Sequence, residues 1–364
     1  MQGLKTEVEI ENKRLALWVI TENGLKTAKR IIDKLPDARL HLSRTLPSNS
    51  SGEAYRFDRL EESVAKVFNN YHGHIFIMST GIVVRIIAPY IQKKTSDPGV
   101  VVMDEKGINV ISLLSGHLGG ANRLAKKIAG IINANPVITT ATDLNFVPAI
   151  DLIAQKKGLF IENPGAIKKV SMALLAKEKI GIHDPLGFIK GDIPLKSLYT
   201  SVSKKDFLAY SEKRPSVFIG DILLDLPSTV LLLRPKTLTA GIGCNRMTPV
   251  DEIRDLLFKV LKESGLSLHS LKQIGTIDLK ADEAGITSLG EQLKIPVKYY
   301  NKQDLAKVDK IKSPSLMVEK HVGVKSVCEA AAIIAAGKGR LIVPKQKTKN
   351  VTVALARESF TSLE

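Results

Sequence analysis

LALWVITENGLKTAKRIIDKL, residues 15–35, joins an apolar run to an amphipathic segment. The run predicts a buried strand, and the segment after it predicts a helix. HIFIMST at residues 74–80 predicts another strand, and a helix over 119–132 is followed by the predicted strand PVITTATD at 136–143. Strands that alternate with helices predict an α/β domain with a doubly wound, mostly parallel sheet.

The length of the chain indicates more than one domain. At 364 residues, two or three domains are expected. We expect an N-terminal α/β domain at 1–143, a small middle α/β region at 144–236 and a separate C-terminal α/β domain at 237–364. The last domain begins with the strand TLTAGIGC and closes with the hairpin LIVPKQKTKNVTVALAR. In the first domain, VVVMDEKGINVIS at 100–112 predicts another hairpin.

The chain is strongly basic. Its 53 Lys and Arg against 37 Asp and Glu give a net charge of +16, which indicates an anionic partner without identifying it. Its 2 cysteines are too few for a disulfide framework and fit a reducing compartment. The charged first residues lack the apolar core of a signal peptide, and the apolar stretch 75–91 is too interrupted to span a bilayer. We therefore expect a cytoplasmic protein with no membrane partner.

SGHLGGANR, residues 115–123, combines glycines and polar side chains between a predicted strand and a predicted helix. Open α/β sheets place ligands at such turns. His117 is a candidate general base, and Asn122 is a candidate partner for a substrate oxygen. Gly119 and Gly120 would let a substrate approach the backbone. The alternative is a capped helix start with a surface histidine, but the coincidence of these residue types favours function.

Two other strand ends carry polar residues. Thr80 and Gly81 end one predicted strand, and TTATD at 139–143 ends another. Because the carboxyl ends of parallel strands meet at one edge of a sheet, we expect both beside His117. Arg85 interrupts an apolar helix face, so it is either a structural ion-pair partner or an anion contact.

GIGCNR, residues 241–246, is expected at a strand-to-helix turn, where free N–H groups favour an anion. Gly241 and Gly243 would let a ligand approach, and Arg246 could clamp a carboxylate. The dinucleotide fingerprint fails because Arg246 occupies the third glycine position, and the P-loop fails because no Gly-Lys-Ser/Thr follows. An ordinary tight turn explains the spacing equally well. Cys244 is either a reactive thiolate or, more simply, a thiol packed under the turn.

Further charged segments lie in the C-terminal third. Lys280, within DLKADE at 278–283, is a candidate anion contact or, more simply, part of a solvated helix start. PKQKTK at 344–349 is a basic hairpin tip, with an anion contact as the alternative, and EKH at 319–321 is similarly ambiguous. No His/Cys cluster has zinc spacing, so no protein-bound metal is predicted. The dispersed basic residues and the lack of a recognition motif predict no nucleic-acid partner.

Several segments resemble, in the same order, the cobalamin biosynthesis protein CbiG family. FIMSTGIVVRIIAP, LLSGHLGGANRLA and ITTATD are similar to its N-terminal region. GIGCNRMTPVDEI, TIDLKADEAGI, EKHVGVKSVCEAAAI and LIVPKQKTKNVTVALAR are similar to its C-terminal domain. The resemblance covers nearly the whole chain after Leu15 and is weakest across the middle. Asn245 departs from it, because a second basic residue is expected beside Arg246.

The resemblance implies cobalt-precorrin-5A hydrolase activity in the anaerobic cobalamin (vitamin B12) pathway. Such an enzyme opens the δ-lactone of the ring-contracted macrocycle and releases acetaldehyde, giving cobalt-precorrin-5B. Cobalt belongs to the substrate, so no cofactor is expected. The implied partners are this anionic cobalt-corrinoid and neighbouring pathway enzymes. A corrinoid precursor bears several carboxylates, which suits a protein with a charge of +16.

Each candidate residue can be assigned a hypothetical role in lactone hydrolysis. His117 would act as base or proton shuttle, and Thr80 and Asn122 would donate to the lactone oxyanion. The glycines would let the substrate approach the backbone. The expected carboxylate contacts are Arg85, Arg246 and Lys280.

Two other classes of function stay open on these residues. A non-catalytic tetrapyrrole-binding or carrier protein of the same pathway would bind the intermediate without releasing acetaldehyde. A nucleic-acid-binding protein would show an affinity that falls steeply with salt. The dispersed basic residues argue against the second class.

Overall fold

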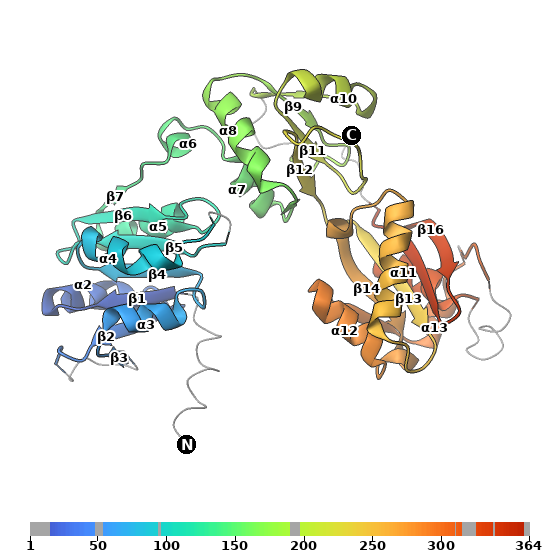
Figure 1. Ribbon diagram of the computed structural model, residues 1–364, viewed down its shortest axis with the longest axis horizontal. Helices are drawn as coiled ribbons and strands as arrows, with labels where there is room; N and C mark the ends of the chain where they lie inside the picture. Colours follow the sequence, from blue (N-terminus) through green and yellow to red (C-terminus); the bar gives the residue numbers. More distant parts are fainter. Residues whose placement is uncertain are drawn as a thin grey trace. The chain divides into compact units, whose positions relative to one another are not determined.

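The computed structural model describes residues 15–47, 54–93, 96–189, 197–309, 311–314, 325–337 and 339–359. The chain forms two compact units, Met1–Leu152 and Ile153–Glu364 (Figure 1). The described residues form one β-sheet in the first unit and two in the second, so the α/β class is confirmed. The expected domain boundaries at 143 and 236 stay a prediction. The EKH motif at 319–321 lies outside the described residues.

The first unit is built on a seven-stranded sheet with the order β3-β2-β1-β4-β5-β6-β7. Its neighbouring strands are parallel except β5 and β6. The expected mostly parallel sheet is therefore confirmed. The strands are β1 (Leu15–Val19), β2 (Ala38–Ser43), β3 (Tyr55–Phe57), β4 (Gly73–Ile77), β5 (Gly99–Met103), β6 (Asn109–Leu114) and β7 (Asn135–Val137).

Helices cover both faces of this sheet, as a doubly wound fold requires. Because successive strand residues point to opposite faces, Leu17 and Val19 pack with α2 and α5. Ala16 and Trp18 pack with α3 and α4 on the other face. The helices between the strands are α2 (Glu22–Ile32), α3 (Leu60–Val67), α4 (Thr80–Ile87) with η1 (Ala88–Tyr90), and α5 (Ala121–Ile132). Helices α6 (Ala141–Leu144) and α7 (Ile150–Lys156) follow β7, the last strand of the sheet.

A hairpin reverses the chain inside this sheet. Asp104 closes the turn between β5 and β6 by accepting a hydrogen bond from the backbone N–H of Asn109 (2.7 Å). Since β6 and β7 run against β4 and β5, their carboxyl ends lie at the opposite edge. Five-residue strands hold the two edges about 15 Å apart. The expectation that Thr80 and Gly81 share an edge with His117 is therefore wrong.

A buried aromatic stack lies on the face that α3 and α4 cover. Trp18, the chain's one tryptophan, stacks on His41 with ring centroids 4.1 Å apart. Trp18 Nε1 donates to His74 Nδ1 (3.1 Å), so His74 Nε2 carries the proton and donates to the carbonyl of Phe68 (2.9 Å). Burial lowers the pKa of His41 to about 3 and the pKa of His74 to about 4. Both imidazoles are therefore neutral at neutral pH.

Acidification should destabilise the first unit through these two histidines. Their pKa is near 6.5 in the unfolded chain and lower in the folded one, so the unfolded state binds more protons and stability falls as the pH drops below about 6.5. Between about pH 7.5 and about pH 5, each histidine should cost about 2 kcal/mol of unfolding free energy.

The fluorescence of Trp18 gives Tm as a function of pH for this unit. His41→Phe keeps an aromatic ring in the stack but cannot be protonated. The slope of Tm against pH that the two histidines cause should therefore fall by about half in this variant. An unchanged slope would contradict the lowered pKa of His41.

The second unit contains a five-stranded sheet of order β10-β9-β11-β12-β8, parallel except for β12 and β8. Arg234 at the end of β12 is buried, and its guanidinium donates to the carbonyls of Gly220 and Ile222. The guanidinium also pairs with Glu162, so the buried charge is compensated. The elements are β8 (Phe160–Ile161), η2 (Pro164–Ala166), α8 (Ile167–Leu175), β9 (Ile180–His183), β10 (Tyr199–Ser201), α10 (Lys204–Lys213), β11 (Ser216–Ile219) and β12 (Leu231–Arg234).

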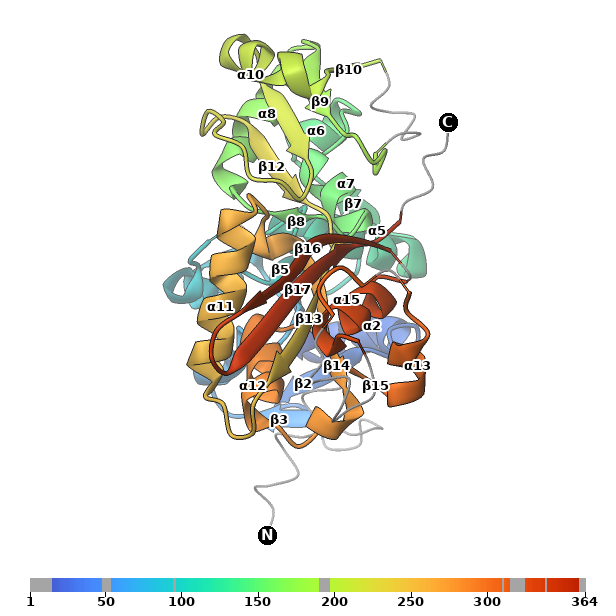
Figure 2. The same cartoon turned by 90° about the vertical axis from the view of Figure 1, so that its right-hand side faces the viewer.

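The other sheet of this unit has the order β15-β14-β13-β17-β16, and its last two strands form the expected closing hairpin. Helices α11 and α15 pack on opposite faces of it (Figure 2). Among the described residues, no helix combines the length and apolar character that a membrane span needs. The elements are β13 (Leu238–Cys244), α11 (Val250–Glu263), η3 (Leu268–Ser270), β14 (Leu271–Ile277), η4 (Asp278–Lys280), α12 (Ala284–Leu293), β15 (Val297–Tyr300), α13 (Lys302–Ala306), α15 (Val327–Ala335), β16 (Arg340–Lys347) and β17 (Val351–Arg357).

Candidate active site

The loop between β6 and α5 is a tight turn that holds His117 and Asn122. Hydrogen bonds between its own backbone groups close the turn. Gly119 lies against Ser115, where an added Cβ would be 2.3 Å from the serine Cβ. The expected opening of Gly119 toward a substrate is therefore not supported, because the turn itself fills that space. Gly120 has φ +80° and precedes α5, and its substrate contact stays a prediction.

His117 is buried and faces a carboxylate on each side. Its Nε2 lies 3.1 Å from Asp143 Oδ2 and 3.1 Å from Thr142 Oγ1, while its Nδ1 lies 3.6 Å from Asp151 Oδ2. Asp151, in the first turn of α7, is itself only 1% exposed. Asp151 and then Asp143 raise the pKa of His117, although burial opposes them. The protonated imidazolium is the form that this geometry favours.

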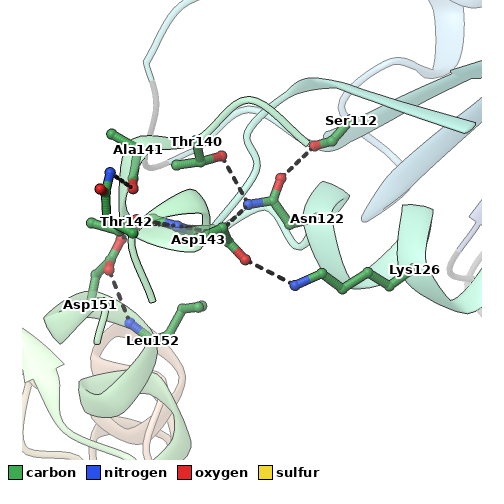
Figure 3. A network of polar contacts seen from close by, with 11 residues as sticks. Ser112, Asn122, Lys126, Thr140, Ala141, Thr142, Asp143, Asp151 and Leu152 are labelled. Atoms are coloured by element: carbon green, nitrogen blue, oxygen red, sulfur yellow. Dashed lines mark hydrogen bonds and ion pairs between the residues drawn. The ribbon is translucent and has the colours of Figure 1, made fainter. Parts of the chain in front are cut away.

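Asp143 lies at the centre of a hydrogen-bond network (Figure 3). Its Oδ2 accepts from Asn122 Nδ2 (2.9 Å) as well as from His117, and its Oδ1 lies 3.0 Å from Lys126 Nζ. Burial alone would raise the pKa of Asp143, but Lys126 and His117 hold it below its usual value. The side chain is 22% exposed, compared with 7% for His117. Asp143 is therefore an ionised carboxylate through which this network reaches solvent.

Asn122 uses both of its amide hydrogens inside the network. Its Nδ2 donates to Thr140 Oγ1 (3.0 Å) and to Asp143 Oδ2, while its Oδ1 accepts from Ser112 Oγ (2.6 Å). An amide has only two N–H donors, so none is left for a lactone oxyanion. The expected oxyanion contact of Asn122 is not supported, and the geometry instead makes Asn122 a positioning residue for Asp143.

Thr80, Gly81 and Arg85 lie on α4, at the edge of the sheet opposite to His117. Arg85 is exposed, and its guanidinium donates to the carbonyl of Gly81 (2.9 Å). Within the described part of the chain it forms no ion pair, so the structural ion-pair alternative is not supported. Contacts of these three residues with substrate stay predictions, in a place separate from the His117 network.

Gly241 and Gly243 lie within β13 rather than in the turn that follows it. Gly241 is buried against α15, and an added Cβ would be 1.8 Å from the carbonyl oxygen of Cys328. The expected substrate contact at Gly241 is therefore not supported, because a helix occupies its open face. Gly243, nearer the end of the strand, lines a cavity together with Lys280.

Arg246 and Lys280 are already engaged with carboxylates. Arg246 pairs with Asp282 and lies 3.3 Å from Glu283 Oε1, while Lys280 Nζ lies 3.2 Å from the same oxygen. A substrate carboxylate would have to join or displace these pairs, so both contacts stay predictions. Burial raises the pKa of the Cys244 thiol, which favours the packed thiol over the reactive thiolate.

Comparisons with known proteins place the chain in a family. Residues 62–143 match the family described as Cobalamin synthesis G N-terminal, residues 148–235 match Cobalamin biosynthesis central region, and residues 238–356 match Cobalamin synthesis G C-terminus. A Priestia megaterium protein named cobalt-precorrin-5A hydrolase is 36% identical over 299 residues, which cover 80% of this chain and 79% of that protein. The chain belongs to the CbiG family.

Other relatives are similar over greater lengths. A Salmonella typhimurium protein, also named cobalt-precorrin-5A hydrolase, is 33% identical over 360 residues, which cover 95% of this chain and 98% of that protein. A solved structure of a putative cobalamin biosynthesis protein G homologue from Sulfolobus solfataricus is 25% identical, covers 96% of this chain and 100% of its own, and has a TM-score of 0.38. The family resemblance expected from the sequence segments is confirmed.

In this CbiG-family chain, three members of the His117 network are not singled out by the sequence. Asp143 appears there only as the end of a polar run, although it links the whole network. Lys126 follows Asn122 by four residues on α5, a spacing that places both side chains on one helix face and could have been recognised. Asp151 has no local signal, because its contact with His117 depends on how α7 packs.

Proposed function

We propose that this chain is a cobalt-precorrin-5A hydrolase of anaerobic cobalamin biosynthesis. The proposal rests on its 36% and 33% identity to two proteins of that name, over 79% and 98% of their lengths. The substrate is an anionic cobalt-corrinoid that brings its own cobalt, and we propose no resident cofactor. The cytoplasm is the proposed compartment, and neighbouring enzymes of the pathway are proposed partners.

The reaction consumes one water and releases one aldehyde. Water adds to the lactone carbonyl, the ring C–O bond breaks, and a carboxylate and a hydroxyl group result. The C–C bond beside the hydroxyl-bearing carbon then breaks. The hydroxyl oxygen loses its proton and becomes the carbonyl oxygen of acetaldehyde, while the electron pair left on the macrocycle takes up a proton. Both steps need a group that accepts protons and gives them back.

Asp143 is the group in the network best placed for this proton transfer. Its carboxylate is ionised and partly exposed, so it can take a proton from the attacking water and pass it to the oxygen that leaves the carbonyl carbon. Lys126 Nζ, 3.0 Å from Asp143 Oδ1, offers a positive charge where the oxyanion develops.

His117 acts behind Asp143 as the proton shuttle. Its imidazolium keeps the carboxylate of Asp143 ionised between turnovers, and the 3.1 Å contact from Nε2 to Oδ2 lets the two groups share a proton. Asp151 holds the other side of the ring, 3.6 Å from Nδ1. Because both nitrogens face carboxylates, a shuttle fits this geometry better than a free base does.

Isotope labelling tests whether water attacks the lactone carbonyl. In water enriched with ¹⁸O, the product should gain one label in the new carboxylate, because the ring C–O bond breaks on the side of the carbonyl carbon. Mass spectrometry of the corrinoid product, with the carboxylates of unreacted substrate as the internal control, measures this gain. A product that forms without label in the carboxylate would overturn the proposed attack, and recovery of intact substrate would favour the carrier alternative.

A further inference from the structure

The second unit contains a cavity that the His117 network does not explain. It has a volume of about 380 Å³ and lies among the end of β13, the start of α15 and the β16–β17 hairpin. Its lining includes the apolar side chains of Ile277, Leu279 and Val327. Four lysines also line it: Lys280, Lys345, Lys347 and Lys349. Apolar walls with a few charged groups are typical of small-molecule sites.

The four lysines differ in how far they are already engaged. Lys280 lies beside Glu283, and Lys345 Nζ donates to the carbonyl of Ser313 (2.8 Å). Lys347 and Lys349 are exposed, and neither forms an ion pair with any residue that the structure describes. These two side chains are therefore free to meet an incoming anion.

A carboxylate also lies at the hairpin tip, but neutral groups hold it. Glu252 on α11 accepts hydrogen bonds from Thr348 Oγ1 (3.3 Å) and Asn350 Nδ2 (3.1 Å). In the part of the chain that the structure describes, Glu252 forms no ion pair with Lys347 or Lys349. The rim of the cavity therefore keeps an excess of positive charge.

A buried glutamate fixes the strand that carries the rim. Glu329 on α15 is 0% exposed, and its carboxylate accepts from the backbone N–H groups of Lys345 (2.8 Å), Lys312 (2.7 Å) and Ser313 (3.1 Å). The register of β16 against β17 shifts between Val343 and Gln346, next to this contact. Glu329 thus anchors an irregular strand that ends at Lys347 and leads into the turn that contains Lys349.

We propose that this cavity binds a carboxylate-bearing edge of the macrocycle, with Lys347 and Lys349 contacting its peripheral carboxylates. The inference rests on the proposed function, because that function supplies a flat apolar ring with an anionic rim. The apolar lining suits the ring, and the lysines suit the carboxylates. An inorganic anion would use the lysines but gain nothing from Ile277, Leu279 or Val327.

Uroporphyrin III, a stable tetrapyrrole octacarboxylate, is the probe for this site. Its fluorescence gives the Kd for the full chain and for the double variant Lys347→Ala/Lys349→Ala. Loss of two exposed charge contacts should raise the Kd by about tenfold. Lys204→Ala/Lys205→Ala removes the same charge from exposed positions on α10 and should change the Kd by less than about twofold.

An equal Kd for both double variants would overturn the proposed site, whether that Kd is unchanged or raised. The release of acetaldehyde by the wild-type chain separates this result from the proposed function. If the wild-type chain releases acetaldehyde but the two double variants have equal Kd values, the proposed site is wrong and the proposed function is unaffected. If the Kd rises only in Lys347→Ala/Lys349→Ala and the wild-type chain releases no acetaldehyde, the hydrolase proposal is wrong and the cavity is supported as a tetrapyrrole-binding site.

Discussion

Replacing Asp143 with asparagine should lower kcat for acetaldehyde release by about 100-fold or more. Asparagine keeps the shape of the side chain, but its amide cannot take a proton from water. Steady-state acetaldehyde release from cobalt-precorrin-5A measures the effect. Asp37→Asn, which removes the same charge from an exposed position of the same unit, is the matched control. A kcat within about twofold of wild type for Asp143→Asn would remove Asp143 from the proposed mechanism.

His117→Gln distinguishes a shuttle from a residue that only supports the fold. Burial raises the pKa of Asp143, and Lys126 and His117 oppose that effect. Without the imidazolium, the pKa of Asp143 should rise, so the acid limb of the kcat profile should move to higher pH. Mere loss of structure would lower kcat without moving the limb. An unshifted limb would therefore contradict the role of His117.

Replacing Gly241 with alanine should destabilise the second unit by about 3 kcal/mol or more. The added methyl would lie 1.8 Å from the carbonyl oxygen of Cys328 and 2.6 Å from the backbone nitrogen of Ala332. Both atoms belong to the backbone of α15, so the helix as a whole has to move away from β13. Unfolding in urea, followed by circular dichroism, measures the loss.

Gly243→Ala is the matched control for this substitution. Its added Cβ would lie 2.8 Å from Thr352 Oγ1, the end of a side chain that can rotate away. The loss of stability should therefore be well below that of Gly241→Ala. If Gly241→Ala were as stable as wild type but bound uroporphyrin III more weakly, Gly241 would be a ligand contact after all.

The parallel part of the first sheet could be predicted from the sequence, because its central strands β1, β4 and β5 contain apolar runs and amphipathic helices lie between the strands. The reversed direction of β6 could also be predicted from the sequence. VVVMDEKGINVIS predicts a hairpin, and a hairpin makes the strand after it antiparallel. Applied to the strand ends, that reasoning would have placed His117 at the edge opposite to Thr80.

The candidate site was only partly predictable. His117 and Asn122 stand out by residue type, whereas Asp151 reaches His117 through tertiary packing that no local pattern encodes. Gly241, in contrast, does have a sequence signal, but that signal fits two different structures. A strand glycine that admits a neighbouring helix has the same sequence signature as one that admits a ligand. Only the position of α15 separates the two cases.

Acetaldehyde release under multiple-turnover conditions tests the proposed activity most directly. Purified chain at a low concentration is incubated without oxygen with a large excess of cobalt-precorrin-5A, and trapped acetaldehyde and the corrinoid product are both quantified. We expect many acetaldehyde molecules per chain and an equal amount of cobalt-precorrin-5B. Substrate that binds but yields no acetaldehyde, beside an active control enzyme, would contradict the hydrolase.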